Sequence, residues 1–234
     1  MPTVTYSQAA LELLNVGLSC IELDLSSGHN TFDLRRIDDP NDCGKSFSDL
    51  QRANIHAAFD PIAISIKPFR LPGGGEIRLN HLVKESATLS WSAERNGSIL
   101  LGVRFESAGH ELVGTVEGNI DNARLLIFLA ATAGRSGELV VTPSTDFHAD
   151  IDILGLPSFL DRRVKSQLLQ QVARETEEQL QISAQQIALG VFRNLSEAGP
   201  DGELLPTPPP NAFYTGVKIT NENATLSWRT SSDT

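Results

Sequence analysis

The chain has 234 residues, of which 40% are hydrophobic and 21% are charged, and it contains 18 glycines and 12 prolines. This length and composition allow a buried core, and they exclude general disorder and collagen-like repetition. Nineteen basic residues oppose 29 acidic ones, so the net charge is −10. Because an acidic surface repels phosphate backbones, we expect no nucleic-acid binding.

The start of the chain lacks the features of an export signal. No basic region precedes the first apolar stretch, and Glu12 and Asn15 interrupt that stretch. The richest apolar run, 125–131, is far shorter than the roughly 18 residues that a membrane span requires. For Cys20 and Cys43 we expect reduced thiols, with a disulfide as the alternative. These features predict a soluble cytoplasmic protein without a transmembrane segment; if a leader has been removed, it is periplasmic or secreted.

Residues 1–60 show the weakest periodicity, although we expect them to belong to a single domain that covers 1–234. Alternation over 20–25 predicts a strand, and residues 7–14 predict a short helix or an extension of that strand. Residues 26–48 have the composition of a loop. Its acidic side chains suit calcium, but the spacing of an EF-hand is missing, so we expect no metal there.

The segment 61–154 predicts a meander of antiparallel strands. Hydrophobic and polar residues alternate over 89–93 and 99–105, and Asn96-Gly97 between them is a hairpin signal. Glycines place further turns at 108–110 and 134–137.

Two strands of this meander stand out. Residues 123–131 are apolar on both faces, which predicts a strand that is covered on both sides. The following strand alternates regularly from 139 to 153. Strands of this length favour a strongly coiled sheet.

A long amphipathic helix is predicted over 157–197. Gly-Leu-Pro ends the preceding strand, and Ser158 is a natural helix cap. One apolar stripe follows at intervals of four residues: Leu160, Val164, Leu168 and Val172. Ser183 and Gln186 are able to cap a second segment, so a break near Ile182 is an alternative. With the meander, this helix predicts the α+β fold class.

After the helix we expect a proline-rich connector over 198–213 and a strand over 214–230. The sequence Ala-Thr-Leu-Ser-Trp occurs at 87–91 and again at 224–228. Two strands with similar packing demands explain the repeat, and a duplicated strand position is the alternative. We use the repeat only to support the C-terminal strand.

The strand that ends at 153 carries a row of polar side chains. Asp146, His148, Asp150 and Asp152 occupy every second position and share one face. The apolar opposite face accounts for this pattern, so we expect a solvated outer face, with a metal or acid–base site as the alternative. Signatures of zinc proteases, hydrolases and phosphate-binding loops are missing. We therefore predict a protein that is not an enzyme, with no catalytic residues, metal or cofactor.

A small basic group lies at the start of the predicted helix. Arg162, Arg163 and Lys165 oppose the helix dipole there. They are either solvated side chains or a local patch that suits a lipid head group or an acidic partner.

The order of elements resembles that of the tubular lipid-binding superfamily, which includes the bactericidal/permeability-increasing proteins and the synaptotagmin-like mitochondrial lipid-binding domains. The similarity rests on 147–171, FHADIDILGLPSFLDRRVKSQLLQQ, where a long strand leads through a Leu-Pro corner into the helix. It implies a strongly coiled antiparallel sheet wrapped around the helix, with an aliphatic groove for acyl chains or another hydrophobic ligand.

We therefore predict a carrier that binds a lipid or other hydrophobic small molecule between sheet and helix. The alternative is a non-catalytic interaction or scaffold module of the same fold with a filled core; a protein partner or a homodimer fits either function. The predicted lining consists of Leu101, Val103, Phe105, Val116, Ile127, Leu129, Val141, Leu160, Val164, Leu168 and Val172. Desolvation would drive binding, because each buried CH₂ contributes about 0.8 kcal/mol.

Overall fold

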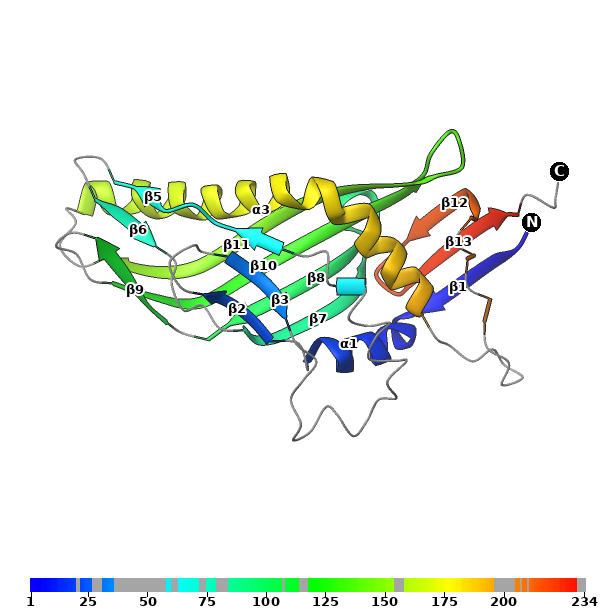
Figure 1. Cartoon of the computed structure of the whole chain (residues 1–234), viewed down its shortest axis with the longest axis horizontal. Coiled ribbons are helices and arrows are strands. Elements are labelled where there is room, and N and C mark those ends of the chain that lie inside the picture. Colours follow the sequence, from blue (N-terminus) through cyan, green and yellow to red (C-terminus); the bar gives the residue numbers. More distant parts are fainter. Residues whose placement is uncertain are drawn as a thin grey trace.

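The computed structural model has an α+β fold in which one long helix lies along an antiparallel sheet (Figure 1). The predicted fold class is confirmed. The structure describes residues 1–19, 22–26, 31–35, 58–59, 63–71, 75–78, 84–106, 108–113, 118–153, 158–195, 205–206, 208–209 and 211–230. The predictions for Cys20, Cys43 and Val116 lie outside these residues.

The main sheet has seven strands in the order β5-β6-β9-β10-β8-β7, with β11 paired to β10. Its strands are β5 (Phe69–Arg70), β6 (Glu76–Arg78), β7 (Lys84–Ser92), β8 (Ser98–Phe105), β9 (Ala108–Val113), β10 (Gly118–Ala133) and β11 (Leu139–Ile153). Antiparallel pairing joins β7 to β8, β8 to β10, and β10 to β11. These strands form the predicted meander.

The turns of the meander agree with the sequence at two places and differ at a third. The short 3-10 helix η3 (Glu94–Asn96) joins β7 to β8, and a turn at 134–137 joins β10 to β11, as predicted. Residues 108–110, which predicted a turn, instead begin β9 and pair with Gly118–Ile120. Antiparallel pairing with β10 holds the glycine there in a strand.

Alternating burial explains why these residues form strands. Ile99, Leu101, Val103 and Phe105 of β8 are all at most 4% exposed. Exposed or half-buried residues lie between them. β8 therefore turns one apolar face into the core and its other face toward solvent.

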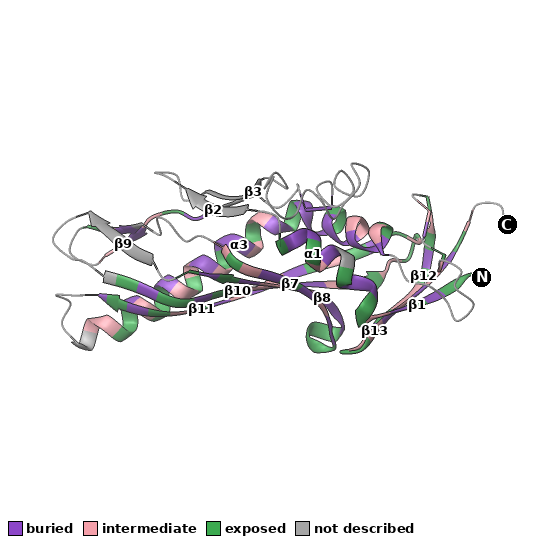
Figure 2. Ribbon diagram, turned by 90° about the horizontal axis from the view of Figure 1, so that it is seen from below, coloured by how far each residue is buried: buried purple, intermediate pink, exposed green. Residues whose placement is uncertain are grey.

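The helix α3 (Ser158–Asn194) is continuous over 37 residues, so the alternative of a break near Ile182 is wrong. Its direction changes part-way along, where the ribbon turns from yellow to gold in Figure 1, but the helix persists. Its buried side follows one stripe through Val164, Leu168, Val172 and Leu180. Figure 2 shows this buried side in purple, facing the sheet.

A second, three-stranded sheet has the order β2-β3-β4. Its strands are β2 (Glu22–Ser26), β3 (Thr31–Arg35) and β4 (Ala63–Ser65). β2 matches the predicted strand, whereas β3 lies within the predicted loop, where its pairing to β2 and β4 stabilises it. The chain then runs through 63–70, which we call the strap, from β4 to β5 of the main sheet, and β4 packs against α3.

The two ends of the described chain meet in a third sheet with the order β1-β13-β12. Its strands are β1 (Thr3–Ser7), β12 (Phe213–Ile219) and β13 (Asn223–Arg229). A single strand was predicted over 214–230; the structure has two, because residues 220–222 turn the chain. The repeated sequence lies in β7 and β13, and the same three residues of each copy are buried: Ala87, Leu89, Trp91, Ala224, Leu226 and Trp228.

The free edge of β7 is covered by the N-terminal segment, which continues from β1 into η1 (Gln8–Leu11) and α1 (Glu12–Ser19). The Asn15 amide accepts a hydrogen bond from Leu89 N–H and donates one to Leu89 C=O. Gln8 accepts from Trp91 N–H and also donates to Leu89 C=O. Two side-chain amides thus take the place of a neighbouring strand. Of residues 7–14, for which a short helix or an extended strand was predicted, Ser7 ends β1 and 8–14 are helical.

Candidate functional site

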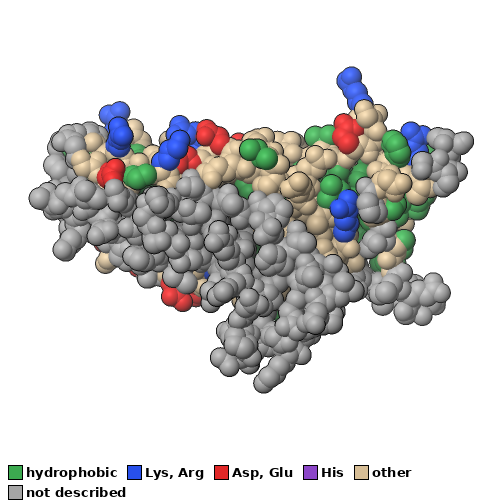
Figure 3. All heavy atoms as spheres, viewed as in Figure 1, with side chains coloured by type: hydrophobic (Ala, Val, Ile, Leu, Met, Phe, Trp, Pro, Cys, Tyr) green, Lys and Arg blue, Asp and Glu red, His purple; other side chains and the backbone are tan. Residues whose placement is uncertain are grey.

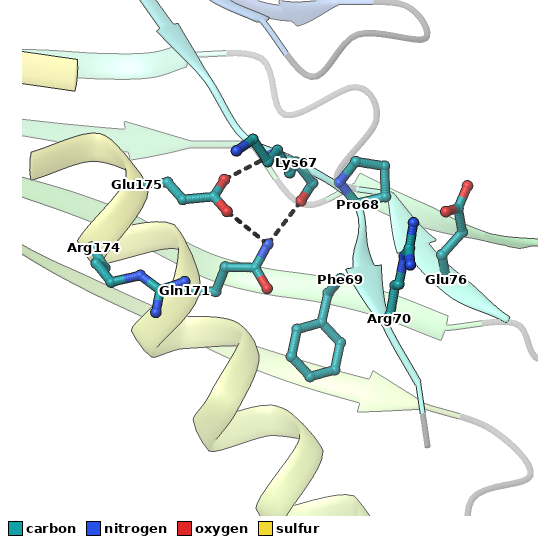
Figure 4. A pocket seen from close by; sticks show the side chains of 8 residues that line it. All are labelled: Lys67, Pro68, Phe69, Arg70, Glu76, Gln171, Arg174 and Glu175. Carbon is teal, nitrogen blue, oxygen red and sulfur yellow. Dashed lines mark hydrogen bonds between the residues drawn. The ribbon is translucent and has the colours of Figure 1, made fainter. Parts of the chain in front are cut away.

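A pocket of about 580 Å³ lies between α3 and the strap (Figure 4). Its size is in the range of small-molecule sites. Its lining comes from three elements, namely the strap, β6 and the middle of α3: Lys67, Pro68, Phe69, Arg70, Glu76, Gln171, Arg174 and Glu175.

The backbone of one strap residue, Lys67, is attached to the helix by two side chains. Glu175 Oε2 accepts a hydrogen bond from Lys67 N–H at 2.7 Å, and Gln171 Nε2 donates to Lys67 C=O at 3.0 Å. Gln171 also donates to Glu175 Oε1 at 3.1 Å. Because residues i and i+4 lie on the same side of a helix, both side chains reach the backbone of the same strap residue. These bonds fix one wall of the pocket.

The pocket combines an apolar floor with a charged rim. Phe69 is 8% exposed and belongs to the same hydrophobic cluster as Val103 and Leu168. In Figure 4 its ring lies between the strap and the helix. The cationic side chains of Lys67, Arg70 and Arg174 are exposed at the rim. The site therefore suits a molecule that is apolar at one end and polar at the other.

The predicted lining residues lie where sheet and helix meet. Most are buried, with exposed fractions of 1–4%: Leu101, Val103, Phe105, Ile127, Leu129, Val164, Leu168 and Val172. Val141 and Leu160 are half-buried, and Val141 packs against the core. None of these residues is among those that line the pocket. Their role in ligand binding stays a prediction.

The basic patch at the start of α3 has fewer free charges than the sequence indicated. Lys165 Nζ lies 2.9 Å from Asp161 and 3.7 Å from Asp152, so its charge is largely neutralised locally. Arg162 and Arg163 are exposed. Figure 3 shows Lys and Arg side chains in blue along the upper left edge of this face, over the region of α3. A head-group role at this position stays a prediction for Arg162 and Arg163.

The row of polar residues on β11 forms an exposed outer face, as predicted. Asp146 makes an ion pair with Arg95 at 3.1 Å, and Asp150 accepts a hydrogen bond from Asn122. Arg95 also lies over the ring of Phe128, 5.4 Å from its centroid. Among the residues that the structure describes, no group of three His, Cys, Asp or Glu side chains could hold a metal ion.

The sequence had not singled out the pocket residues. The missed signal is the pair Gln171 and Glu175, because Glu175 borders the apolar stripe of α3 and yet is only 8% exposed. A charged residue that is buried in this way needs partners. Its partner is a backbone N–H some hundred residues earlier, which periodicity in the helix does not reveal.

Comparison with known proteins finds distant likenesses among solved structures alone. No family model and no curated protein matches the sequence. The crystal structure of lipopolysaccharide binding protein is similar with a TM-score of 0.34 and 11% sequence identity, over 97% of this chain. The match covers 48% of that protein's chain, so this chain spans about half its length. In the described part of the chain, no helix is long and apolar enough to cross a membrane.

Proposed function

We propose that this protein is a non-catalytic carrier of a hydrophobic or lipid-like ligand and a member of the tubular lipid-binding superfamily. The observation that carries the proposal is the pocket between α3 and the strap, whose floor residue Phe69 is part of the main hydrophobic cluster. An apolar chain that enters there meets Pro68 and Phe69, and Phe69 packs in the same hydrophobic cluster as the aliphatic side chains of the sheet and of α3. Desolvation of that chain would supply the affinity, at about 0.8 kcal/mol per CH₂.

A buried hydroxyl on the helix also supports an occupied interior. Thr176 is fully buried on the apolar stripe of α3, and within the described residues its Oγ1 has no hydrogen-bond partner. A buried polar group without a partner costs free energy and calls for an explanation. A polar atom of a ligand, or a water molecule that accompanies it, would provide the missing bond.

The alternative is an interaction or scaffold module with a filled core. The observation in its favour is the very low exposure of the predicted lining residues, because a packed core buries them equally well. Such a module would act through its surface or as a homodimer and would take up no apolar molecule.

Ligand uptake distinguishes the two functions. Native mass spectrometry of gently purified protein should show a co-purifying apolar molecule, and a fluorescent fatty acid should bind in a saturable way. If neither result is obtained, the carrier function is excluded and the interaction module with a filled core remains.

Neighbouring residues of β11 offer a matched test of the lining. Val141 is half-buried against the core, whereas the side chain of Val140 points to the opposite face and is 40% exposed. We expect V141W to reduce fatty-acid affinity by tenfold or more, since an indole in the lining takes the place of the ligand. V140W should bind as the wild type does. Equal affinities of the two variants, both with a wild-type thermal transition, would show that Val141 does not line the site.

A further inference from the structure

We propose that the pocket between α3 and the strap binds the anionic head group of an amphiphile, an oxyanion held between the guanidinium groups of Arg70 and Arg174. This inference rests on the proposed function and names the class of ligand: an acyl or alkyl chain that carries a carboxylate or a phosphate.

Cations from different elements converge on the pocket. Arg70 belongs to β5, Arg174 to the middle of α3, and Lys67 to the strap, and all three side chains are exposed at the rim. Within the described residues, the side chains of Arg70 and Lys67 make no ion pair. Arg174 Nε lies 3.8 Å from Glu178, with both side chains 68% exposed, a separation at which an ion pair contributes little. These charges remain available to a ligand.

The two carboxylates that line the pocket are outnumbered by its three cations. Glu175 accepts hydrogen bonds from Lys67 N–H and from Gln171, so its oxygens are committed to the wall. Glu76 lies on β6 opposite Arg70 in the strand register. The lining holds three cations against two carboxylates, an excess of one positive charge, and Glu178 beside Arg174 lies outside the lining. On a chain with a net charge of −10, such a local excess can concentrate an anion that most of the surface repels.

The chemistry of the rim and of the floor selects an amphiphile. Guanidinium groups match carboxylate and phosphate oxygens through paired hydrogen bonds. Phe69 and Pro68 line the same pocket as the cations, and Phe69 belongs to the main hydrophobic cluster. A small inorganic anion would leave this apolar floor unused. A ligand with an anionic head and an apolar tail uses both parts.

The exposed arginines at the start of α3 provide a matched control. Arg162 and Arg163 lie on the same helix as Arg174 and are exposed like it. Twelve residues of helix place Arg162 about 18 Å from Arg174. Replacement of Arg162 and Arg163 by glutamine removes two positive charges, as replacement of Arg70 and Arg174 does. The two double variants therefore differ only in where the charges are removed.

Isothermal titration of the full chain with dodecyl phosphate, dodecanoate, dodecanol and inorganic phosphate tests the inference. The wild type should bind the two anionic amphiphiles more tightly than dodecanol. We expect R70Q/R174Q to weaken dodecyl phosphate about 10- to 100-fold, as lost charge-assisted hydrogen bonds would, with dodecanol affinity within twofold. R162Q/R163Q should keep the preference for anions. Because all four side chains are exposed, we expect each variant to retain the wild-type thermal transition.

Each contrary outcome has a distinct meaning. If dodecanol binds as tightly as the anionic probes, or if R162Q/R163Q alone removes the preference, this inference is overturned while the carrier function stands. If inorganic phosphate binds as tightly as dodecyl phosphate, the site is one for free anions and the amphiphile is excluded. If no chain-bearing probe binds to the wild type, the proposed function fails.

Discussion

At the scale of single residues, Gly97 shows why the hairpin between β7 and β8 takes its particular form. Its φ is +91°, and it follows Arg95 and Asn96, which also have positive φ values. A Cβ atom placed on Gly97 would lie 2.8 Å from the carbonyl oxygen of Ile219. The turn therefore needs glycine for its conformation and for its close approach to the C-terminal strands.

Substitution of this glycine should destabilise the protein strongly. We expect G97A to lower the free energy of unfolding by about 1–3 kcal/mol, from backbone strain and from the clash with Ile219. Gly102 in β8 is the control, since its φ is ordinary and a Cβ there would meet only atoms at 3.6 Å or more. G102A should change stability by less than about 0.5 kcal/mol. Urea unfolding of the two variants measures this difference, and equal stabilities would contradict the described turn.

At the scale of elements, the continuity of α3 decides how the helix supports the site. The helix passes through Ile182, whose side chain is 88% exposed. Its first half carries Gln171 and Glu175 at the pocket. Its second half has a wider buried face, which includes Ala188 and Phe192. One continuous helix thus connects the pocket to buried residues of the core.

A single proline substitution tests the continuity of α3. In an unbroken helix, I182P removes a hydrogen bond and clashes with the preceding turn, so we expect a loss of about 3 kcal/mol or more. I182Q changes an exposed side chain only and should remain within about 0.5 kcal/mol of the wild type. Thermal unfolding followed by circular dichroism compares them. A tolerated proline would mean that two helices meet at this residue.

The sequence predicted the elements whose pattern is regular over a long stretch. The alternation in β11 and the stripe of α3 identified both, because each repeats over many residues. The turn at 108–110 was misplaced and β3 was missed, since pairing with distant strands stabilised residues with weak intrinsic preference. The pocket could not be predicted from a periodic pattern, because the bond between Glu175 and Lys67 joins residues far apart in sequence.

At the scale of the whole molecule, the N-terminal and C-terminal strands are neighbours. β1 pairs with β13 from Thr3 opposite Ser227 to Ser7 opposite Asn223. Trp228 N–H also donates to the carbonyl oxygen of Pro2. Figure 1 shows the two ends of the chain side by side at one end of the molecule. The third sheet thus joins segments that lie more than two hundred residues apart.

This proximity predicts that the chain tolerates circular permutation. A short Gly-containing linker from Thr230 to Pro2 would close the pair β1–β13 as a hairpin. New ends between Arg135 and Ser136 lie in an exposed turn, so we expect the permuted chain to keep its circular dichroism spectrum and a cooperative thermal transition. A permutant opened between Leu126 and Ile127, inside β10, should not fold. Failure of both permutants would contradict the pairing of the two ends.

The amides of Gln8 and Asn15 have a consequence for how copies of this protein behave toward one another. An open strand edge is a template on which a second chain can add a strand, and long edges of this kind lead to aggregation. At Leu89 and Trp91 the chain's own side chains already occupy the bonding positions that an added strand would need. Two molecules therefore cannot join along this stretch of β7 until the N-terminal segment detaches, so the first residues of the chain protect the folded protein in concentrated solution.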